Sequence, residues 1–152
     1  MSYTERFTEV HSLLTTLHPV SRGIATTDSA WVSVANYHRV ILLINVGAMA
    51  QGATLDVQIR QATNTAGAGA KGIPTTAAQS KLITQLTQAG GDGNQNLAIE
   101  LRTEELDVNG GFDCISVRDT VGGGAVLLEY ELFGIEPRYA PVGVTAWQEV
   151  ID

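Results

Sequence analysis

The longest unbroken apolar run in the chain, Val40 to Ile44, is the feature that most constrains the fold. It lies within Tyr37–Val46, a segment rich in β-branched residues. An apolar run bounded by polar residues is typical of a strand that is buried on both faces. A short buried helix has the same pattern, but the segment ends at Val46-Gly47, which favours a central strand. We therefore expect the other strands to pair beside Tyr37–Val46 or to pack over it.

Alternation of apolar and polar residues predicts further strands. It is clearest in Thr54–Gln61, where Leu55, Val57 and Ile59 are expected to face a core while the residues between them face water or a partner. A hairpin through Asn109-Gly110 is expected to join Leu106–Val108 to Phe112–Arg118. The other predicted strands are Trp31–Val34, Lys81–Leu86, Asn96–Arg102 and Ala125–Phe133. About seven short strands without helices between them predict an all-β fold, an antiparallel β-sandwich or jelly roll.

Residues 2–17 have a different pattern. Ser2 and Glu5 fit a capping box at the start of a helix. His18-Pro19 should end that helix, because a residue before proline disfavours the α region. Between them, apolar side chains recur at roughly helical spacing: Phe7, Val10, Leu14 and Leu17. We expect a short amphipathic helix or arm, which either folds onto its own core or reaches a neighbouring subunit.

The last segment of the chain has no period and is interrupted by two prolines, Pro137 and Pro141. It predicts an extended arm that continues through Trp147. The expected organisation is an N-terminal arm or short helix over residues 1–18, a β-sandwich over 19–137 and an extended C-terminal arm over 138–152. The residues of the two arms expected to form protein interfaces are Phe7, Val10, Leu14, Arg138, Tyr139 and Trp147.

Composition argues against several classes of protein. The net charge is −7 with only nine Lys and Arg residues, so we expect no binding to nucleic acid, which rests on cationic side chains. No apolar run approaches the length of a membrane span, and the N-terminus has no evident secretory signal. Cys114 is the single cysteine, is expected to be a small buried hydrophobe, and indicates synthesis in a reducing compartment.

No motif predicts catalysis. Gly67–Gly72 satisfies the pattern G-x-G-x-x-G, but Ile73-Pro74 follows where a dinucleotide site needs a helix. The Ala89–Gln95 loop lacks the ligand pattern of an EF-hand, and the three histidines lack partners at metal-ligand spacing. Glu129 and Glu131 share one strand face, which indicates solvent or a basic partner rather than a glycosidase cleft. We expect no enzyme activity, metal or cofactor.

Four short motifs together resemble a group of small structural proteins of tailed bacteriophages, the head decoration or cement proteins. The resemblance spans roughly residues 20–142. It rests on Trp31-Val32-Ser33, Tyr37-His38-Arg39-Val40, Ala68-Gly69-Ala70-Lys71 and Arg138-Tyr139-Ala140-Pro141.

This resemblance implies a virion protein on the capsid exterior, made in the cytoplasm of a bacterial host. Its expected partners are a major capsid protein of the HK97-type fold, whose shell it would stabilise, and further copies of itself in a homo-oligomer. Two alternatives stay open at this point: a neck or tail component of the virion, and a carbohydrate-binding β-sandwich. A carbohydrate site would need clustered exposed aromatic residues, whereas Trp31 and Trp147 lie far apart in the sequence.

Overall fold

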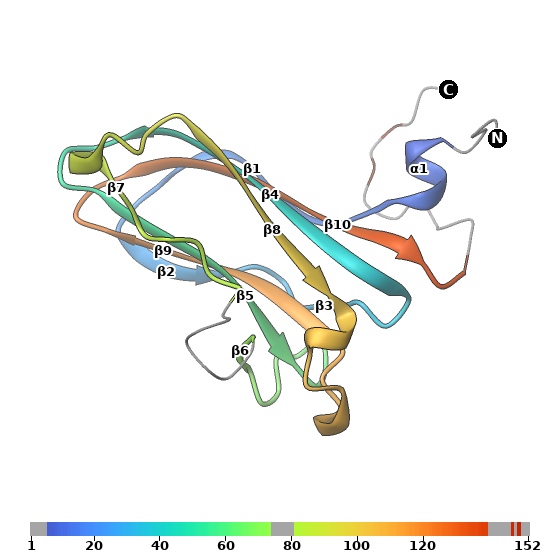
Figure 1. Ribbon diagram of the computed structural model, residues 1–152. Helices are drawn as coiled ribbons and strands as arrows, with labels where there is room; N and C mark the ends of the chain where they lie inside the picture. The colour runs from blue at the N-terminus through green and yellow to red at the C-terminus, as the bar shows by residue number, and fades with distance from the viewer. Residues whose placement is uncertain (1–5, 74–80, 140–146, 148, 150–152) are drawn as a thin grey trace.

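Two antiparallel sheets face each other across one hydrophobic core in the computed structural model, which describes residues 6–73, 81–139, 147 and 149 (Figure 1). Sheet A, the upper layer in Figure 1, has the order β1 (Ser12–Arg22), β10 (Val126–Pro137), β4 (Tyr37–Met49) and β8 (Gln95–Arg102). Sheet B has the order β2 (Ala25–Asp28), β9 (Cys114–Gly122), β5 (Thr54–Ala62) and β6 (Lys71–Gly72). Two short strands extend sheet B, with β3 (Val32–Ser33) on β9 and β7 (Leu86–Thr87) on β5.

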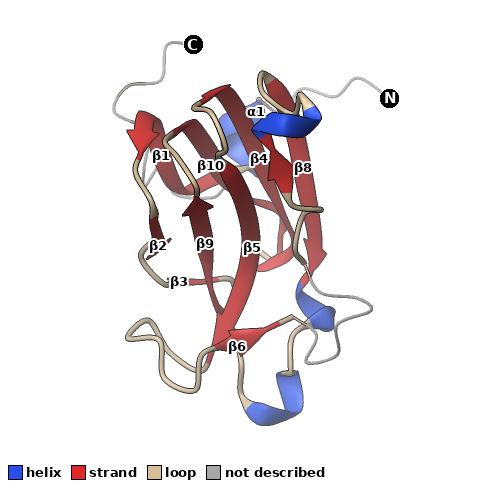
Figure 2. Cartoon of the chain, turned by 90° about the vertical axis from the view of Figure 1, so that its left-hand side faces the viewer, coloured by secondary structure: helices blue, strands red, loops and turns tan. Residues whose placement is uncertain are grey.

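The strand pairing is that of a jelly roll. The first strand, β1, pairs with the last, β10, and the following pairs are β2 with β9, β4 with β8, and β5 with β7. A long antiparallel hairpin that winds into two sheets gives this nested pattern. Figure 2 shows the strands of sheet B, β2, β9 and β5, in front of those of sheet A. The predicted all-β sandwich or jelly roll is therefore confirmed.

The apolar run at Val40–Ile44 lies inside β4, an inner strand of sheet A between β10 and β8. Its buried side chains alternate as Val40, Leu42, Ile44 and Val46, and these belong to the core. Leu43, on the opposite face, is 39% exposed. The prediction of burial on both faces was wrong, because an antiparallel sheet can pack one face on the core and leave the other toward solvent.

The helix predicted over residues 2–17 was wrong in its described part, apart from one turn, α1 (Phe7–Val10). Residues 12–18, expected in an N-terminal arm, instead belong to β1, which pairs with β10. Leu14 and Leu17 pack against the core from this strand, so the pairing overrides their helical spacing. Pro19 is tolerated because β1 is at the sheet edge and its register is interrupted between Leu17 and Val20.

Two further strand predictions fail in the connections. In Lys81–Leu86, Leu82 makes an isolated bridge to Gln58 and Leu86 begins β7, so no continuous strand forms. The connection between β8 and β9 holds two 3₁₀ turns, η3 (Thr103–Glu105) and η4 (Val108–Gly110), in place of the expected hairpin. Asp107 is the reason for the second turn, because its carboxylate accepts a hydrogen bond of 3.1 Å from the Gly110 amide. A third 3₁₀ turn, η2 (Gln88–Gly90), precedes β8.

The tight connection from β9 to β10 depends on Gly123. Its φ is +71°, in the left-handed region, and an added Cβ would collide with the backbone carbonyl oxygen of Gly52. Gly91 also has a positive φ, +79°, but no atom lies within 4 Å of the place its Cβ would take. Alanine at Gly91 would therefore introduce backbone strain alone, whereas alanine at Gly123 would introduce the same strain and a steric clash.

We expect Gly91→Ala to lower the free energy of unfolding by about 1 kcal/mol, the cost of the left-handed conformation. Gly123→Ala should cost about 3 kcal/mol or more, because a backbone collision adds to the same strain. Urea denaturation of both variants measures the difference. Equal losses for the two variants would show that the Gly52 contact does not constrain this connection.

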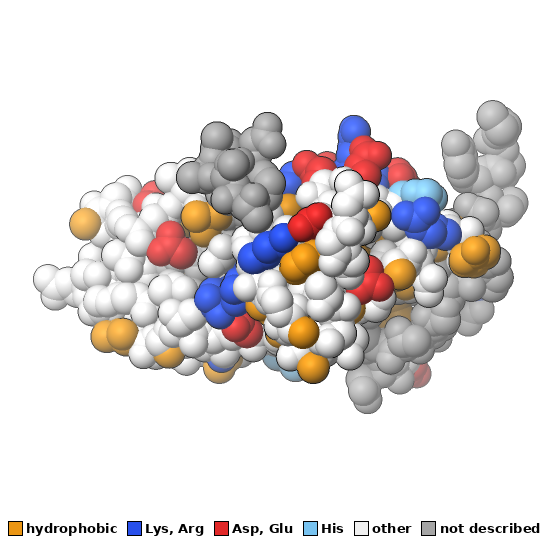
Figure 3. All heavy atoms as spheres, turned by 90° about the horizontal axis from the view of Figure 1, so that it is seen from below, with side chains coloured by type: hydrophobic (Ala, Val, Ile, Leu, Met, Phe, Trp, Pro, Cys, Tyr) orange, Lys and Arg blue, Asp and Glu red, His pale blue; other side chains and the backbone are white. Residues whose placement is uncertain are grey.

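Two aspartates of sheet B have opposite electrostatic surroundings. Asp119 is buried on the inner face of β9, and burial raises its carboxyl pKa although Arg22 Nη2 lies 3.3 Å from its Oδ2. Asp28 accepts two hydrogen bonds of 2.6 Å from Arg118, and these lower its pKa. Figure 3 shows the lower side of the molecule, where acidic and basic side chains lie next to each other and hydrophobic ones are scattered.

These shifts predict pH dependences of opposite sign. The raised pKa of Asp119 means that its contribution to stability is complete at low pH and is lost as the pH rises through the folded-state pKa. The lowered pKa of Asp28 means that its contribution is present at neutral pH and is lost in acid, below the ordinary range of a carboxyl group.

The measurement is urea denaturation of the unmodified protein, Asp119→Asn and Asp28→Asn between about pH 7 and pH 3. From neutral to acid, the unmodified protein should gain stability relative to Asp119→Asn and lose it relative to Asp28→Asn. Differences that do not change with pH, or that change with the same sign for both variants, would contradict these assignments.

Candidate functional site

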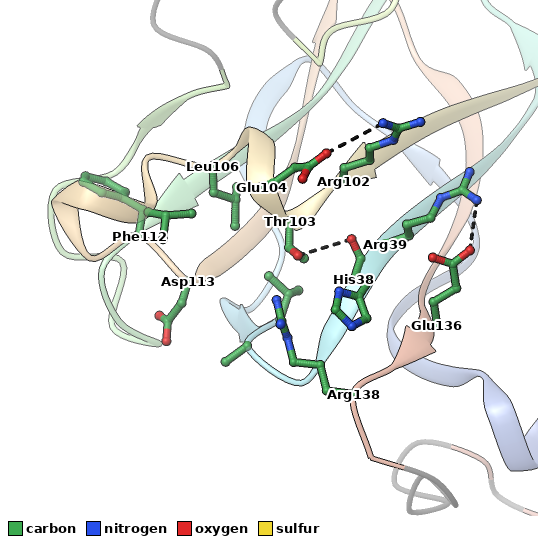
Figure 4. A pocket seen from close by; sticks show the side chains of 13 residues that line it. His38, Arg39, Arg102, Thr103, Glu104, Leu106, Phe112, Asp113, Glu136 and Arg138 are labelled. Carbon is green, nitrogen blue, oxygen red and sulfur yellow. Dashed lines mark hydrogen bonds and ion pairs between the residues drawn. The ribbon is translucent and has the colours of Figure 1, made fainter.

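An open groove of about 730 Å³ lies at the end of the sandwich where β4 begins and where β8 and β10 end (Figure 4). Its apolar wall includes Val34, Leu106 and Phe112. Charged and polar side chains line the rest, namely His38, Arg39, Arg102, Glu104, Asp113, Glu136 and Arg138. The volume falls within the range of roughly 300–1,000 Å³ in which ligand sites are found.

The connection between β8 and β9 forms one wall of this groove and is fixed by two buried polar side chains. The Thr103 hydroxyl lies 3.0 Å from the Tyr37 carbonyl oxygen and 3.2 Å from that of His38. Gln61, buried on β5, accepts a hydrogen bond of 2.8 Å from the Asp107 amide and donates one of 2.9 Å to the Gly72 carbonyl. Since satisfied buried polar groups restrict geometry, the groove has a fixed shape on this side.

Ion pairs neutralise part of the rim. Arg39 lies 3.1 Å from Glu136 and 3.1 Å from Glu100, and the hydrogen bond that Arg39 donates to Glu136 is the main reason that the Arg39 pKa is raised. Arg102 lies 3.7 Å from Glu104. These side chains are exposed, so the pairs contribute little to stability but hold the charges in place.

Two donor side chains at the rim have no such partner. Within residues 6–73 and 81–139, neither the Arg138 guanidinium nor the His38 ring makes a hydrogen bond or ion pair, and both extend into the groove in Figure 4. Arg138 is positioned by its backbone amide, which donates to the Asn36 carbonyl at 2.8 Å. A guanidinium held in this way is suited to bind a carboxylate or another anion.

A second cluster lies on the outer face of sheet A. Phe133 is only 5% exposed although it is outside the main core, since its neighbour Leu132 points inward. Phe7 meets its ring edge-on at a centroid distance of 5.7 Å, and Trp147 lies 6.1 Å from it. Phe7 also stacks on His11 at 4.3 Å. Residues from the two ends of the chain therefore cover this part of the sheet.

The six residues predicted for interfaces lie in three places. Phe7 and Trp147 meet on Phe133, with Val10 half-buried in the same turn of helix as Phe7. Leu14 is partly buried and packs against the core of its own sandwich. Arg138 and Tyr139 follow β10, and Tyr139 is 78% exposed. Residues 140–146, 148 and 150–152 of the predicted C-terminal arm lie outside the described part of the chain.

Other sequence motifs have structural roles. Gly67 lies where a Cβ would meet the Trp31 indole, and the Gly67–Gly72 motif ends in strand β6 rather than in a helix. Cys114 is buried, and burial raises its thiol pKa to about 11, so it stays a thiol at neutral pH. Asp92 accepts hydrogen bonds within its own turn, from the Thr87 amide at 2.9 Å among others.

The described residues form neither a metal site nor a membrane helix. No three His, Cys, Asp or Glu side chains in that part of the chain are placed to share a metal ion. None of its helices is long and apolar enough to cross a membrane.

Among the described residues, the groove is therefore the best candidate for a binding site. It combines an apolar wall, a rim of fixed charges and an arginine directed into the opening. Comparison with known proteins adds no further assignment. No family model, no curated protein and no solved structure matches this chain.

Proposed function

We propose that this chain is a bacteriophage virion structural protein, a capsid decoration or cement protein. It would bind the outside of the shell formed by the major capsid protein, together with further copies of itself, and would stabilise that shell. Four short motifs carry the resemblance behind this proposal, and residues from two of them line one groove.

The observation that carries the proposal is the position of two of those motifs. Tyr37-His38-Arg39-Val40 and Arg138-Tyr139 are about a hundred residues apart in the sequence, yet β4 and β10 bring them together. Tyr37 pairs with Pro137 and Arg39 with Ile135. Residues of both motifs line the groove, so a shared sequence pattern corresponds to one continuous surface.

This surface has the composition of a protein docking site. Tyr139 is a large exposed side chain with an apolar ring and a polar hydroxyl, a type enriched at interface centres. The groove beside it carries paired charges on its rim, as the polar border of an interface does. Many copies bound to one shell would add avidity even where each contact is weak.

Two alternative functions are a neck or tail component and a carbohydrate-binding module. A neck or tail component could use the same surface and would differ in its place on the virion. A carbohydrate module would need an exposed aromatic platform, but Trp31 lies half-buried beside Gly67 and Trp147 lies against Phe133. The decoration protein is therefore the function we favour.

We expect Tyr139→Ala to lower occupancy on assembled shells by about tenfold or more, because truncating an aromatic anchor typically costs about 2 kcal/mol. Its effect on the melting temperature of the free protein should be small, since the side chain is 78% exposed. Occupancy is measured by co-sedimentation of purified variants with undecorated shells.

Ile24→Ala is the matched control. Ile24 is also a large exposed apolar residue, 68% exposed, but it lies between β1 and β2 at the opposite end of the sandwich. Trp147→Ala is less informative, because Trp147 contacts Phe133 and its loss would affect folding as well. Equal occupancy for Tyr139→Ala and the unmodified protein would exclude this end as the docking surface.

A further inference from the structure

Asn109-Gly110 is a reactive dipeptide in an exposed turn. Asn109 is the one asparagine of the sequence that is followed by glycine, and both residues are exposed in η4. In asparagine deamidation the backbone nitrogen of the next residue attacks the side-chain amide carbon, and glycine leaves that nitrogen unobstructed. We propose that Asn109 is a deamidation site, and that opening of the η4 turn, which the Asp107 side chain caps, sets the rate of the reaction.

The reaction needs water and no other reactant outside the chain. The Gly110 nitrogen forms a bond to Asn109 Cγ, and the side-chain amide group leaves as ammonia, taking up the proton that the Gly110 nitrogen loses. The product is a cyclic imide. Water then adds to either carbonyl of the imide and opens the ring, giving aspartate or isoaspartate. In isoaspartate the main chain runs through the side-chain carbons.

The attacking nitrogen is engaged in the folded chain. The Gly110 N–H donates to Asp107 Oδ1 at 3.1 Å and to the Asp107 carbonyl oxygen at 3.0 Å. The carboxylate also lies against Gly110, since a Cβ at that position would be 2.7 Å from Asp107 Oδ2. The turn therefore requires the same glycine that makes Asn109 reactive. While both hydrogen bonds hold, the Gly110 amide is fixed on Asp107, so the attack requires the turn to open.

Contacts on either side keep the turn closed. The Asp107 amide donates to Gln61 Oε1 at 2.8 Å, and its carboxylate pairs with Lys71 at 2.5 Å. Lys71 Nζ also lies 3.9 Å from the centroid of the Phe112 ring, and the Phe112 amide donates to the Asp107 carbonyl at 3.1 Å. Both ends of the turn are thus held. The rate of a slow reaction in the open form then follows the opening equilibrium.

Deamidation would change the groove as well as the charge. Val108 and Phe112, on either side of the dipeptide, line the groove. Isoaspartate adds a methylene group to the main chain between them, so the Gly111 amide would no longer meet the Val108 carbonyl oxygen at 3.0 Å. A reacted copy therefore loses this wall of the groove as the protein ages. The reaction itself does not depend on the virion assignment, because it requires only this chain and water.

The test compares the unmodified full-length protein with Asp107→Ala and Asp107→Asn at mildly alkaline pH, using peptide mapping by mass spectrometry to follow conversion at Asn109. Asp107→Ala should speed conversion by about fivefold, the factor expected when a capping side chain is lost. Asp107→Asn is the matched control. It also loses the negative charge and the pair with Lys71, but it keeps a side-chain oxygen that can cap the turn, so its rate should stay well below that of Asp107→Ala.

Concentrated urea separates the fold from the local sequence. All three proteins should convert at a similar and faster rate there, because the turn is absent. Faster conversion in Asp107→Ala than in Asp107→Asn, with a difference that vanishes in urea, supports the proposal. Equal rates for the two folded variants, conversion as fast in the folded protein as in urea, or no conversion at Asn109 in urea would each overturn it.

Hydrogen exchange of the Gly110 amide is a second measurement that needs no variant. The amide should be protected in the folded unmodified protein, because the same opening exposes it to solvent and to reaction. If Asp107→Ala does not fold, this protection together with slower conversion in the folded unmodified protein than in urea supports the proposal. An unprotected Gly110 amide would overturn it.

Discussion

The pairing of β10 with both β1 and β4 is the interaction on which the rest of the structure depends. β10 lies between the first strand of the chain and the strand that holds its longest apolar run, and it contributes Leu128, Tyr130 and Leu132 to the core. Because β1 and β10 are the first and last strands of the jelly roll, this pairing also closes the nested order of the other strands. It brings the segments next to both ends of the chain to one end of the sandwich, where α1 and the end of β10 lie (Figure 1).

Both candidate surfaces follow from that pairing. The register that places Leu13 opposite Phe133, and Phe133 opposite Ile41, creates an apolar row on the outer face of sheet A, which Phe7 and Trp147 cover. A few residues further along, the same strands place Arg39 beside Glu136 and direct Arg138 into the groove. Trp147 thus contacts β10 itself, at Phe133, whereas the proposed docking surface at Tyr139 lies just beyond the end of that strand.

Local patterns in the sequence predict the strands but not how they meet. The alternation of Leu55, Val57 and Ile59 identifies β5, because a strand with one buried face needs no information from elsewhere in the chain. The spacing of Phe7, Val10, Leu14 and Leu17 indicates a helix, but the pairing of Ser12–Arg22 with β10 decides the outcome. Asn109-Gly110 is typical of a hairpin turn, but the cap formed by Asp107 stabilises a 3₁₀ turn there instead. The groove could not be predicted, because its residues come from the ends of three strands, β4, β8 and β10, and from the connections beside them, whose proximity depends on long-range register. Of the groove residues, only Arg138 was among those predicted for an interface, and His38 and Arg39 were part of a motif of the resemblance.

Absolute quantification of this protein relative to the major capsid protein, in purified virions produced from the genome that encodes it, tests the central claim most directly. A decoration protein that covers the shell should be present at a copy number comparable to that of the shell protein, and mild dissociation should release it while the shell stays assembled. A few copies per particle would place it in the neck or tail. Its absence from purified virions would contradict the proposed function altogether.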